Sequence, residues 1–135
     1  MYGPPGHAYV YFTYGMHWLF NTVTRPAGEP EAVLIRAIVP VEGITVMAER
    51  RGHQPRRHWT DGPAKLTQAF GIDGQHNNLD LTAPDAEIFI EEGINVPDEW
   101  VTNGPRVGLF TVPEPWKSKP WRFLVVDAGQ RFPIP

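Results

Sequence analysis

Cysteine is absent from the 135 residues, and the chain contains no run of about 18 consecutive apolar residues. Disulfides, zinc–thiolate clusters and cysteine nucleophiles are therefore excluded. The five histidines are scattered without a metal-binding spacing, so we expect neither a metal site nor another cofactor. The first residues do not read as a basic segment followed by an apolar signal core, and we expect a cytoplasmic protein that does not contact membranes.

An excess of positive charge is also lacking. The net charge is −3, which argues against a uniformly basic nucleic-acid binder. The average hides a separation, because five cations lie within residues 50–65 and seven acidic residues within residues 80–99. One part of the chain could face phosphate while another faces water, although both runs could equally be solvated surface. With 41% hydrophobic residues, the composition is typical of a folded domain.

Aromatic and β-branched residues dominate two neighbouring segments, 8–13 and 18–24. Four residues that include a glycine separate them, a pattern that predicts a β-hairpin. Alternation along the first strand places Tyr9 and Tyr11 on one face. Tyr14 is beside the glycine at the tip, where a large aromatic side chain can protrude.

The next segments predict one strand and two helices. Residues 32–39 are apolar except for Arg36, which predicts a strand buried on both faces and a cation that is costly to bury. A short amphipathic helix is expected over residues 45–51. A second helix, of about two turns, is expected from Pro63 to a stop near Gly71.

Further strands are expected at residues 87–91, 106–110 and 120–126. The fold class is therefore α+β, with a strand-rich, mixed or antiparallel β core, a central hairpin and two or three short helices. No internal repeat and no clear linker occur, so we expect a single domain over residues 1–135. We also expect a monomer. Three aromatic side chains near the end of the chain are expected in the core: Trp116, Trp121 and Phe123.

Five short strings of the sequence carry a resemblance to a known family. They are Pro5–Tyr11 with Tyr14-Gly15-Met16 and Asn21, Val33–Ala37 with Pro40–Gly43, Gly62–Ala69, Arg106-Val107-Gly108, and Lys119–Phe123. In this order the strings resemble the alkyladenine (3-methyladenine) DNA glycosylases over nearly the whole chain. The resemblance implies a fold similar to the formyltransferase C-terminal domain. It also implies DNA repair by flipping alkylated or deaminated purines out of double-stranded DNA and hydrolysing their N-glycosidic bond.

The resemblance assigns roles to residues of the hairpin. Tyr14 matches the aromatic that wedges into the base stack, and the alternative is a tyrosine packed under a neighbouring loop. Tyr11 matches a wall of the base pocket, whereas Tyr9 is expected in the sheet core. Asn21 matches the position that rejects guanine by crowding its exocyclic amine. The alternative for Asn21 is an edge-strand residue that faces water.

Other residues match positions near the sugar and the phosphates. Arg36 matches a residue near the reacting sugar or phosphate. Leu34 matches a residue that lines the pocket, although core packing explains it equally well. Lys65, near the start of the second helix, is the expected phosphate contact, because a helix N-terminus attracts anions. Arg50 and Arg51 are expected to extend this contact to DNA phosphate.

Hydrolysis of an N-glycosidic bond needs a carboxylate that activates water. The family's general base is a glutamate upstream of the hairpin, and the chain has no such segment, so we assign no catalytic residue. Nothing in the sequence assigns the role of general base to Glu29, Glu31 or Glu42. We expect a chain truncated at the N-terminus that supplies base recognition and DNA binding to a monofunctional glycosylase. The alternatives are a non-catalytic module that binds damaged DNA and a poorly folded fragment with an exposed sheet edge.

Overall fold

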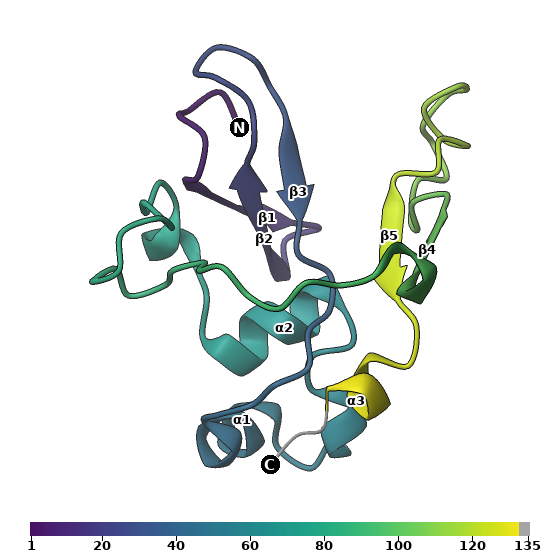
Figure 1. The fold of residues 1–135 in the computed structure, drawn as a ribbon. Coiled ribbons are helices and arrows are strands. Elements are labelled where there is room, and N and C mark those ends of the chain that lie inside the picture. The colour runs from purple at the N-terminus through teal and green to yellow at the C-terminus, as the bar shows by residue number, and fades with distance from the viewer. Residues whose placement is uncertain (133–135) are drawn as a thin grey trace. The chain divides into compact units, whose positions relative to one another are not determined.

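The computed structural model describes residues 1–132, which fall into two compact units, one over residues 1–92 and the other from residue 93 onward. The first unit contains β1 (Ala8–Thr13), β2 (His17–Val23), β3 (Ala32–Leu34), α1 (Ile44–Arg51) and α2 (Pro63–Phe70) (Figure 1). The second contains β4 (Val101–Gly104), β5 (Arg122–Val125) and α3 (Ala128–Arg131). Single 3₁₀ turns lie at Arg56–His58, Gly74–His76 and Asp98–Trp100.

A tight hairpin joins β1 to β2, which pair antiparallel along the whole length of β1. At the tip, Tyr14 and Gly15 both have positive φ, 51° and 64°. The Met16 N–H donates to the Thr13 carbonyl at 3.1 Å. Positive φ at both central residues is the pattern of a type I′ turn, whose twist matches that of paired strands. The predicted hairpin is confirmed.

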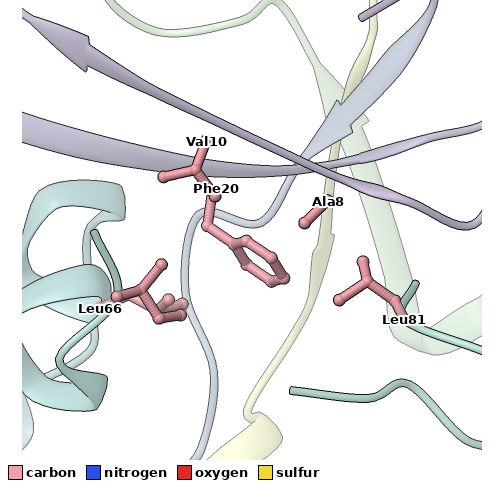
Figure 2. Close-up of a cluster of buried hydrophobic side chains, with 6 residues drawn as sticks. Ala8, Val10, Phe20, Leu66 and Leu81 are labelled. Atoms are coloured by element: carbon pink, nitrogen blue, oxygen red, sulfur yellow. The ribbon is translucent and has the colours of Figure 1, made fainter. Parts of the chain in front are cut away.

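One face of the hairpin packs against α2 and makes the core of the first unit. The buried members of this core are Ala8, Val10, Phe20, Leu66, Ile72 and Leu81 (Figure 2). Each fully buried side chain of this kind that is larger than alanine stabilises the fold by about 1.5–3 kcal/mol. Thr67 Oγ1 donates to the carbonyl of Trp18 at 2.9 Å, which fixes α2 against β2.

Helix α1 packs on α2 through a second apolar cluster. Ile44, Met47 and Ala48 recur at helical spacing, and Met47 is buried together with Trp59 and Ala69. Both helices that the sequence predicts are therefore confirmed, because each one has an apolar face with a partner to bury it.

The expected strand at residues 32–39 is shorter and less buried than predicted. It ends at Leu34 and pairs only with β2, so β3 is an edge strand, and the Val33 side chain is 51% exposed. Ile38 instead exchanges hydrogen bonds with Thr60, through its N–H at 3.2 Å and its carbonyl at 2.8 Å. The prediction of burial on both faces is wrong because the second half of the run contacts the loop before α2 and no second strand.

Two other expected strands do not form. At residues 87–91, the Ile90 N–H donates to the Leu81 carbonyl at 2.8 Å, and Ile88 packs on the core, so the alternation reflects core contacts made by a loop. At residues 106–110 the chain turns at Gly108, whose φ is +84°. The strand that pairs with β5 is β4, which the sequence did not predict.

The last strand and the fold class are confirmed. Residues 120–126 contain β5, and the described chain combines antiparallel sheets of three and two strands with short helices, an α+β arrangement. The aromatic side chains expected in the core near the end of the chain are exposed instead, by 48% for Trp116 and Trp121 and by 69% for Phe123. That expectation is wrong because a two-stranded sheet with one short helix encloses too little volume for three large rings.

Within residues 1–132, none of the helices has the length and apolar character needed to cross a membrane. In the same residues, no group of three or more histidine or carboxylate side chains is arranged to hold a metal ion.

Candidate functional site

The face of the hairpin opposite the core carries a row of side chains that spans three strands. Tyr9 of β1 is opposite Asn21 of β2, and Asn21 is opposite Leu34 of β3. Tyr11 occupies the next position on this face, opposite Leu19. The sheet therefore brings together three of the residues expected in the base pocket: Tyr11, Asn21 and Leu34.

The two tyrosines of β1 form a stacked pair. The ring centres of Tyr9 and Tyr11 are 5.1 Å apart, and the ring planes differ by 28°. Both side chains are half-buried, so the expectation that Tyr9 belongs to the core is wrong. Tyr9 instead packs against Tyr11 on the face of the hairpin opposite the core. Burial raises the pKa of the Tyr11 hydroxyl, and neighbouring Tyr9 and Tyr14 raise it further. At neutral pH Tyr11 is thus an uncharged phenol that can stack, donate and accept.

Tyr14 is 86% exposed at the hairpin tip. The alternative of a tyrosine packed under a neighbouring loop is therefore wrong. Its φ of +51° lies in the left-handed region, which costs an L-residue with a bulky side chain about 1–2 kcal/mol. Asparagine or glycine would suit the turn better, so the stability of the hairpin does not explain a tyrosine here.

Asn21 is buried in the middle strand of the three-stranded sheet, with 7% of its surface exposed. The alternative of an edge residue facing water is therefore wrong. Its Nδ2 donates to the backbone carbonyl of Tyr9 at 3.1 Å. Its Oδ1 accepts no hydrogen bond from residues 1–132, which leaves an acceptor beside the tyrosine pair.

Leu34 and Arg36 lie at and beyond the end of β3. Leu34 is half-buried as the last residue of the strand. Arg36 is also half-buried, and it forms no salt bridge with any residue that the structure describes. The expectation of a buried cation in an apolar strand is wrong because β3 ends before Arg36.

The hairpin tip and α2 border the same hollow. Its lining residues are Met16, His17, Trp18, Ala64, Thr67, Gln68 and Ile72. Because the first three follow Tyr14 in the chain and the next three surround Lys65, the predicted wedge and the predicted phosphate contact belong to elements that meet at this hollow.

Lys65 is held by a carboxylate just before α2. Its Nζ is 2.8 Å from Asp61 Oδ1, and His58 Nδ1 is 2.7 Å from Asp61 Oδ2. The hydrogen bond from His58, followed by that from Lys65, lowers the pKa of Asp61 to about 2. Arg57 Nε is 3.1 Å from His58 Nε2. Asp61 is therefore ionised at neutral pH and contacts two basic side chains, His58 and Lys65, of which His58 is bonded in turn to Arg57.

Arg50 and Arg51 make their contacts with the protein itself. Arg50 donates to the Ala69 carbonyl at 3.2 Å, where a cation is favourable beside the last carbonyls of α2. Arg51 donates to the Gln68 side chain and, at 3.3 Å, to the His58 carbonyl. Both guanidinium groups thus fix α1 to α2, and their contact with DNA phosphate stays a prediction.

No described residue is assigned as a general base. Glu31 accepts hydrogen bonds from Thr24 Oγ1 at 2.8 Å and from Arg25 Nε at 3.1 Å, and these bonds lower its pKa. It is fixed in the loop between β2 and β3 by these two bonds. Glu29 lies in the same loop, and Glu42 follows β3.

Sequence reasoning missed the partners of two site residues. Asp61 precedes Lys65 by four positions, a spacing that favours an ion pair at a helix start and was available in the sequence. The stack of Tyr9 on Tyr11 was harder to predict from the sequence. Strand alternation places both side chains on one face but does not say which face meets the core.

Comparison with known proteins identifies the family. Residues 1–129 match the family model described as Methylpurine-DNA glycosylase (MPG). Two relatives, both named "Putative 3-methyladenine DNA glycosylase", come from Carboxydothermus hydrogenoformans (47% identical, covering 93% of this chain and 63% of the relative) and Salinibacter ruber (43% identical, covering 100% and 62%). A relative of the same name from Rhodopseudomonas palustris strain BisB18 is 46% identical, with 91% and 58% covered.

An α+β chain with this hairpin and this similarity is of the glycosylase class. It belongs to the methylpurine-DNA glycosylase family. The resemblance found in the sequence is thereby confirmed. The chain spans about three fifths of the length of the curated relatives it matches.

Proposed function

We propose that this chain recognises damaged bases and binds DNA as part of a DNA glycosylase that releases alkylated or deaminated purines. The observation that carries the proposal is the row on the hairpin face, where the stacked tyrosines lie beside a buried asparagine. A flipped purine needs a flat apolar surface and a polar group that tests its edge, and this row offers both.

Tyr11 is the stacking platform. Base–aromatic stacking contributes about 1–3 kcal/mol per base and accepts different purines. The Tyr9 ring behind it holds the platform in place. Because the pKa of Tyr11 is raised, the ring carries no phenolate charge at neutral pH and offers an electron-rich face to a cationic alkylated purine.

Tyr14 fills the space that the flipped base leaves. Its exposure at the hairpin turn lets the ring enter the base stack without rearrangement of the sheet. The unfavourable backbone conformation of Tyr14 supports a role for its ring other than stabilising the fold. Asparagine or glycine would form the same turn with a smaller free-energy penalty.

Asn21 discriminates among purines. A buried amide whose Nδ2 already donates to Tyr9 cannot turn freely, so a purine edge that does not fit it is rejected. Guanine carries an exocyclic amine at C2 that adenine and hypoxanthine lack, and crowding of that amine excludes guanine. Leu34, the next residue in the row, lines the same surface, and Arg36 beyond it contacts the sugar or a phosphate.

Lys65 binds a DNA phosphate beside the wedge. The first backbone N–H groups of α2 add the positive end of the helix dipole. Asp61 already holds Lys65, so phosphate must displace or share this carboxylate. Arg50 and Arg51 add positive charge near the opposite end of the helix.

The test compares two aromatic variants of the intact chain. Tyr11→Leu removes the proposed platform, whereas Phe12→Leu is a matched control on the opposite face, where Phe12 is 50% exposed. Fluorescence anisotropy would measure the affinity for duplexes with one hypoxanthine or ethenoadenine and for the undamaged duplex. We expect Tyr11→Leu to reduce the preference for damage by at least about fivefold, and Phe12→Leu to retain it.

Equal affinity of the unaltered chain for damaged and undamaged duplexes would contradict the proposal. The same samples can be treated with alkali to reveal abasic sites. Strand breaks would show that the chain itself releases the base. Binding without breaks would restrict its function to recognition.

A further inference from the structure

The loop between β4 and β5 gathers two tryptophans around one lysine in the second unit. In Figure 1 this loop extends from the end of the two-stranded ribbon. Lys119 Nζ lies 4.5 Å from the centre of the Trp116 ring and 4.7 Å from that of Trp121. The two rings are 5.8 Å apart and tilted by 46°. One ammonium group therefore contacts both indole rings.

A second cation is fixed to the same ring pair. The guanidinium carbon of Arg106 lies 5.1 Å from the centre of the Trp121 ring. One of its terminal nitrogens donates to the Trp116 carbonyl at 3.2 Å. Its Nε is buried and has no hydrogen-bond partner among residues 1–132. We call Arg106, Trp116, Lys119 and Trp121 the tryptophan–cation cluster.

The positive charge of this cluster is not balanced. Neither Arg106 nor Lys119 forms a salt bridge with any described residue. Glu114 is the one acidic residue within residues 106–122, which hold four cations. Its two carboxylate oxygens accept hydrogen bonds from Ser118, from the hydroxyl at 2.5 Å and from the backbone N–H at 3.2 Å. The carboxylate is therefore directed to Ser118.

The cluster is also open to a partner. Both indole side chains are 48% exposed, and cation–π contacts with aromatic rings hold the cations in place without neutralising them. Arg and Lys side chains are the usual contacts to phosphate oxygens in protein–DNA complexes, and the exposed aromatic faces beside these cations offer apolar surface to the neighbouring sugars. An apolar protein surface would bury these cations without an anion, which is unfavourable.

We propose that the tryptophan–cation cluster binds the sugar–phosphate backbone of DNA, as a contact that does not depend on the damaged base. Arg106 and Lys119 contact phosphates, and the indole rings of Trp116 and Trp121 pack on the sugars. The inference rests on the proposed function, because it gives the second unit a role in holding the same DNA.

The experiment measures binding of the intact chain to an undamaged duplex over a series of salt concentrations. Lys119→Ala and Arg106→Ala each remove one cation of the cluster. Arg131→Ala is the control, because Arg131 also lies over an indole ring in this unit, 4.4 Å from the centre of Trp100, but outside the cluster. We expect each cluster variant to bind about three- to tenfold more weakly and to lose about one from the slope of log affinity against log salt. The control should match the unaltered chain.

A further variant separates charge from structural support. Lys119→Arg keeps the cation and its stacking on the rings, so it should restore most of the affinity that Lys119→Ala loses. If Lys119→Arg binds as weakly as Lys119→Ala, the lysine only supports the loop and the proposal is overturned. Unchanged affinity and salt slope in Lys119→Ala would overturn it as well.

The failure of this inference differs from the failure of the proposed function. The cluster variants should bind damaged and undamaged duplexes more weakly by the same factor, so the preference for damaged DNA should stay unchanged. If the unaltered chain prefers damage and Lys119→Ala changes nothing, only the backbone contact is rejected. If the unaltered chain shows no preference for damage while Lys119→Ala still weakens binding, only the proposed function is rejected.

Discussion

The side chain of Asn21 donates through Nδ2 to the backbone carbonyl of Tyr9, 3.1 Å away on the neighbouring strand. This bond links the residue that would test a purine edge to the residue that supports the stacking platform. A change at Asn21 therefore affects both the polar filter and the position of the tyrosine rings.

The first prediction concerns this bond. Asn21→Ala removes a hydrogen bond in a buried site and leaves a small cavity, so we expect the free energy of unfolding to fall by about 1–2 kcal/mol. Urea denaturation at neutral pH measures the change. Asn103→Ala is the matched control, because Asn103 lies exposed in β4. Equal stability of Asn21→Ala and the unaltered chain would show that the bond contributes nothing to the fold.

The second prediction concerns the hairpin tip. Tyr14→Asn places the residue that type I′ turns prefer before Gly15, so we expect the free energy of unfolding to rise by about 0.5–1 kcal/mol. Affinity for a duplex with a damaged base should fall, because the wedge is lost. Thermal unfolding and fluorescence anisotropy measure the two effects. A variant that is more stable and still binds damaged DNA normally would remove the case for the wedge.

The third prediction concerns acid stability near α2. The pKa of Asp61 lies at about 2 in the folded chain, below the ordinary value of 3.8 for an aspartate, so the carboxylate stabilises the folded state above pH 4. That contribution is lost as the pH falls from about 4 to 2. The difference in unfolding free energy between the unaltered chain and Asp61→Asn should be constant near neutral pH and shrink toward pH 2. A difference that stays constant down to pH 2 would contradict this ion pair.

The same substitution tests the competition for Lys65. Asp61→Asn frees the ammonium group from a carboxylate 2.8 Å away, so we expect tighter binding to undamaged duplex and a steeper salt dependence. Asp73→Asn is the control, because Asp73 instead caps the 3₁₀ turn at Gly74–His76. Weaker binding by Asp61→Asn would mean that Asp61 positions Lys65 for phosphate and does not compete with it.

Local signals in the sequence were sufficient for the hairpin and for both helices. Strand alternation and a glycine at the tip predict β1 and β2, and an apolar stripe after Pro63 predicts α2. They failed in the second half of residues 32–39 and at residues 87–91, where apolar side chains pack against the core or a loop while the backbone forms no strand. Hydrophobic periodicity indicates which side chains are buried. A strand forms only where the backbone can also pair with the free edge of a neighbouring strand.

The sequence predicted which residues form the candidate site better than it predicted the contacts between them. The resemblance to the family named Tyr11, Tyr14 and Asn21, and the backbone placed Tyr11 and Asn21 on one face. The resemblance to the family could not show that Asp61 holds Lys65, because it concerns residues that contact DNA and says nothing of their partners within the protein. Nor could composition show that Lys119 is shared by two tryptophans, since that contact depends on the path of an irregular loop.

The last prediction tests the packing between the hairpin and the turn after α2. A Cβ added at Gly74 would lie 2.7 Å from the tip of the Trp18 ring, a distance at which the ring must move. Trp18 is half-buried against the core, and its ring centre lies 4.8 Å from that of Phe12 with the two rings tilted by 46°, so the shift reaches the hairpin as well. We expect Gly74→Ala to lower the free energy of unfolding by about 1–3 kcal/mol. Gly3→Ala is the control, because a Cβ there meets nothing within 4 Å. Equal melting temperatures for the two variants would show that Trp18 does not pack on Gly74 in solution.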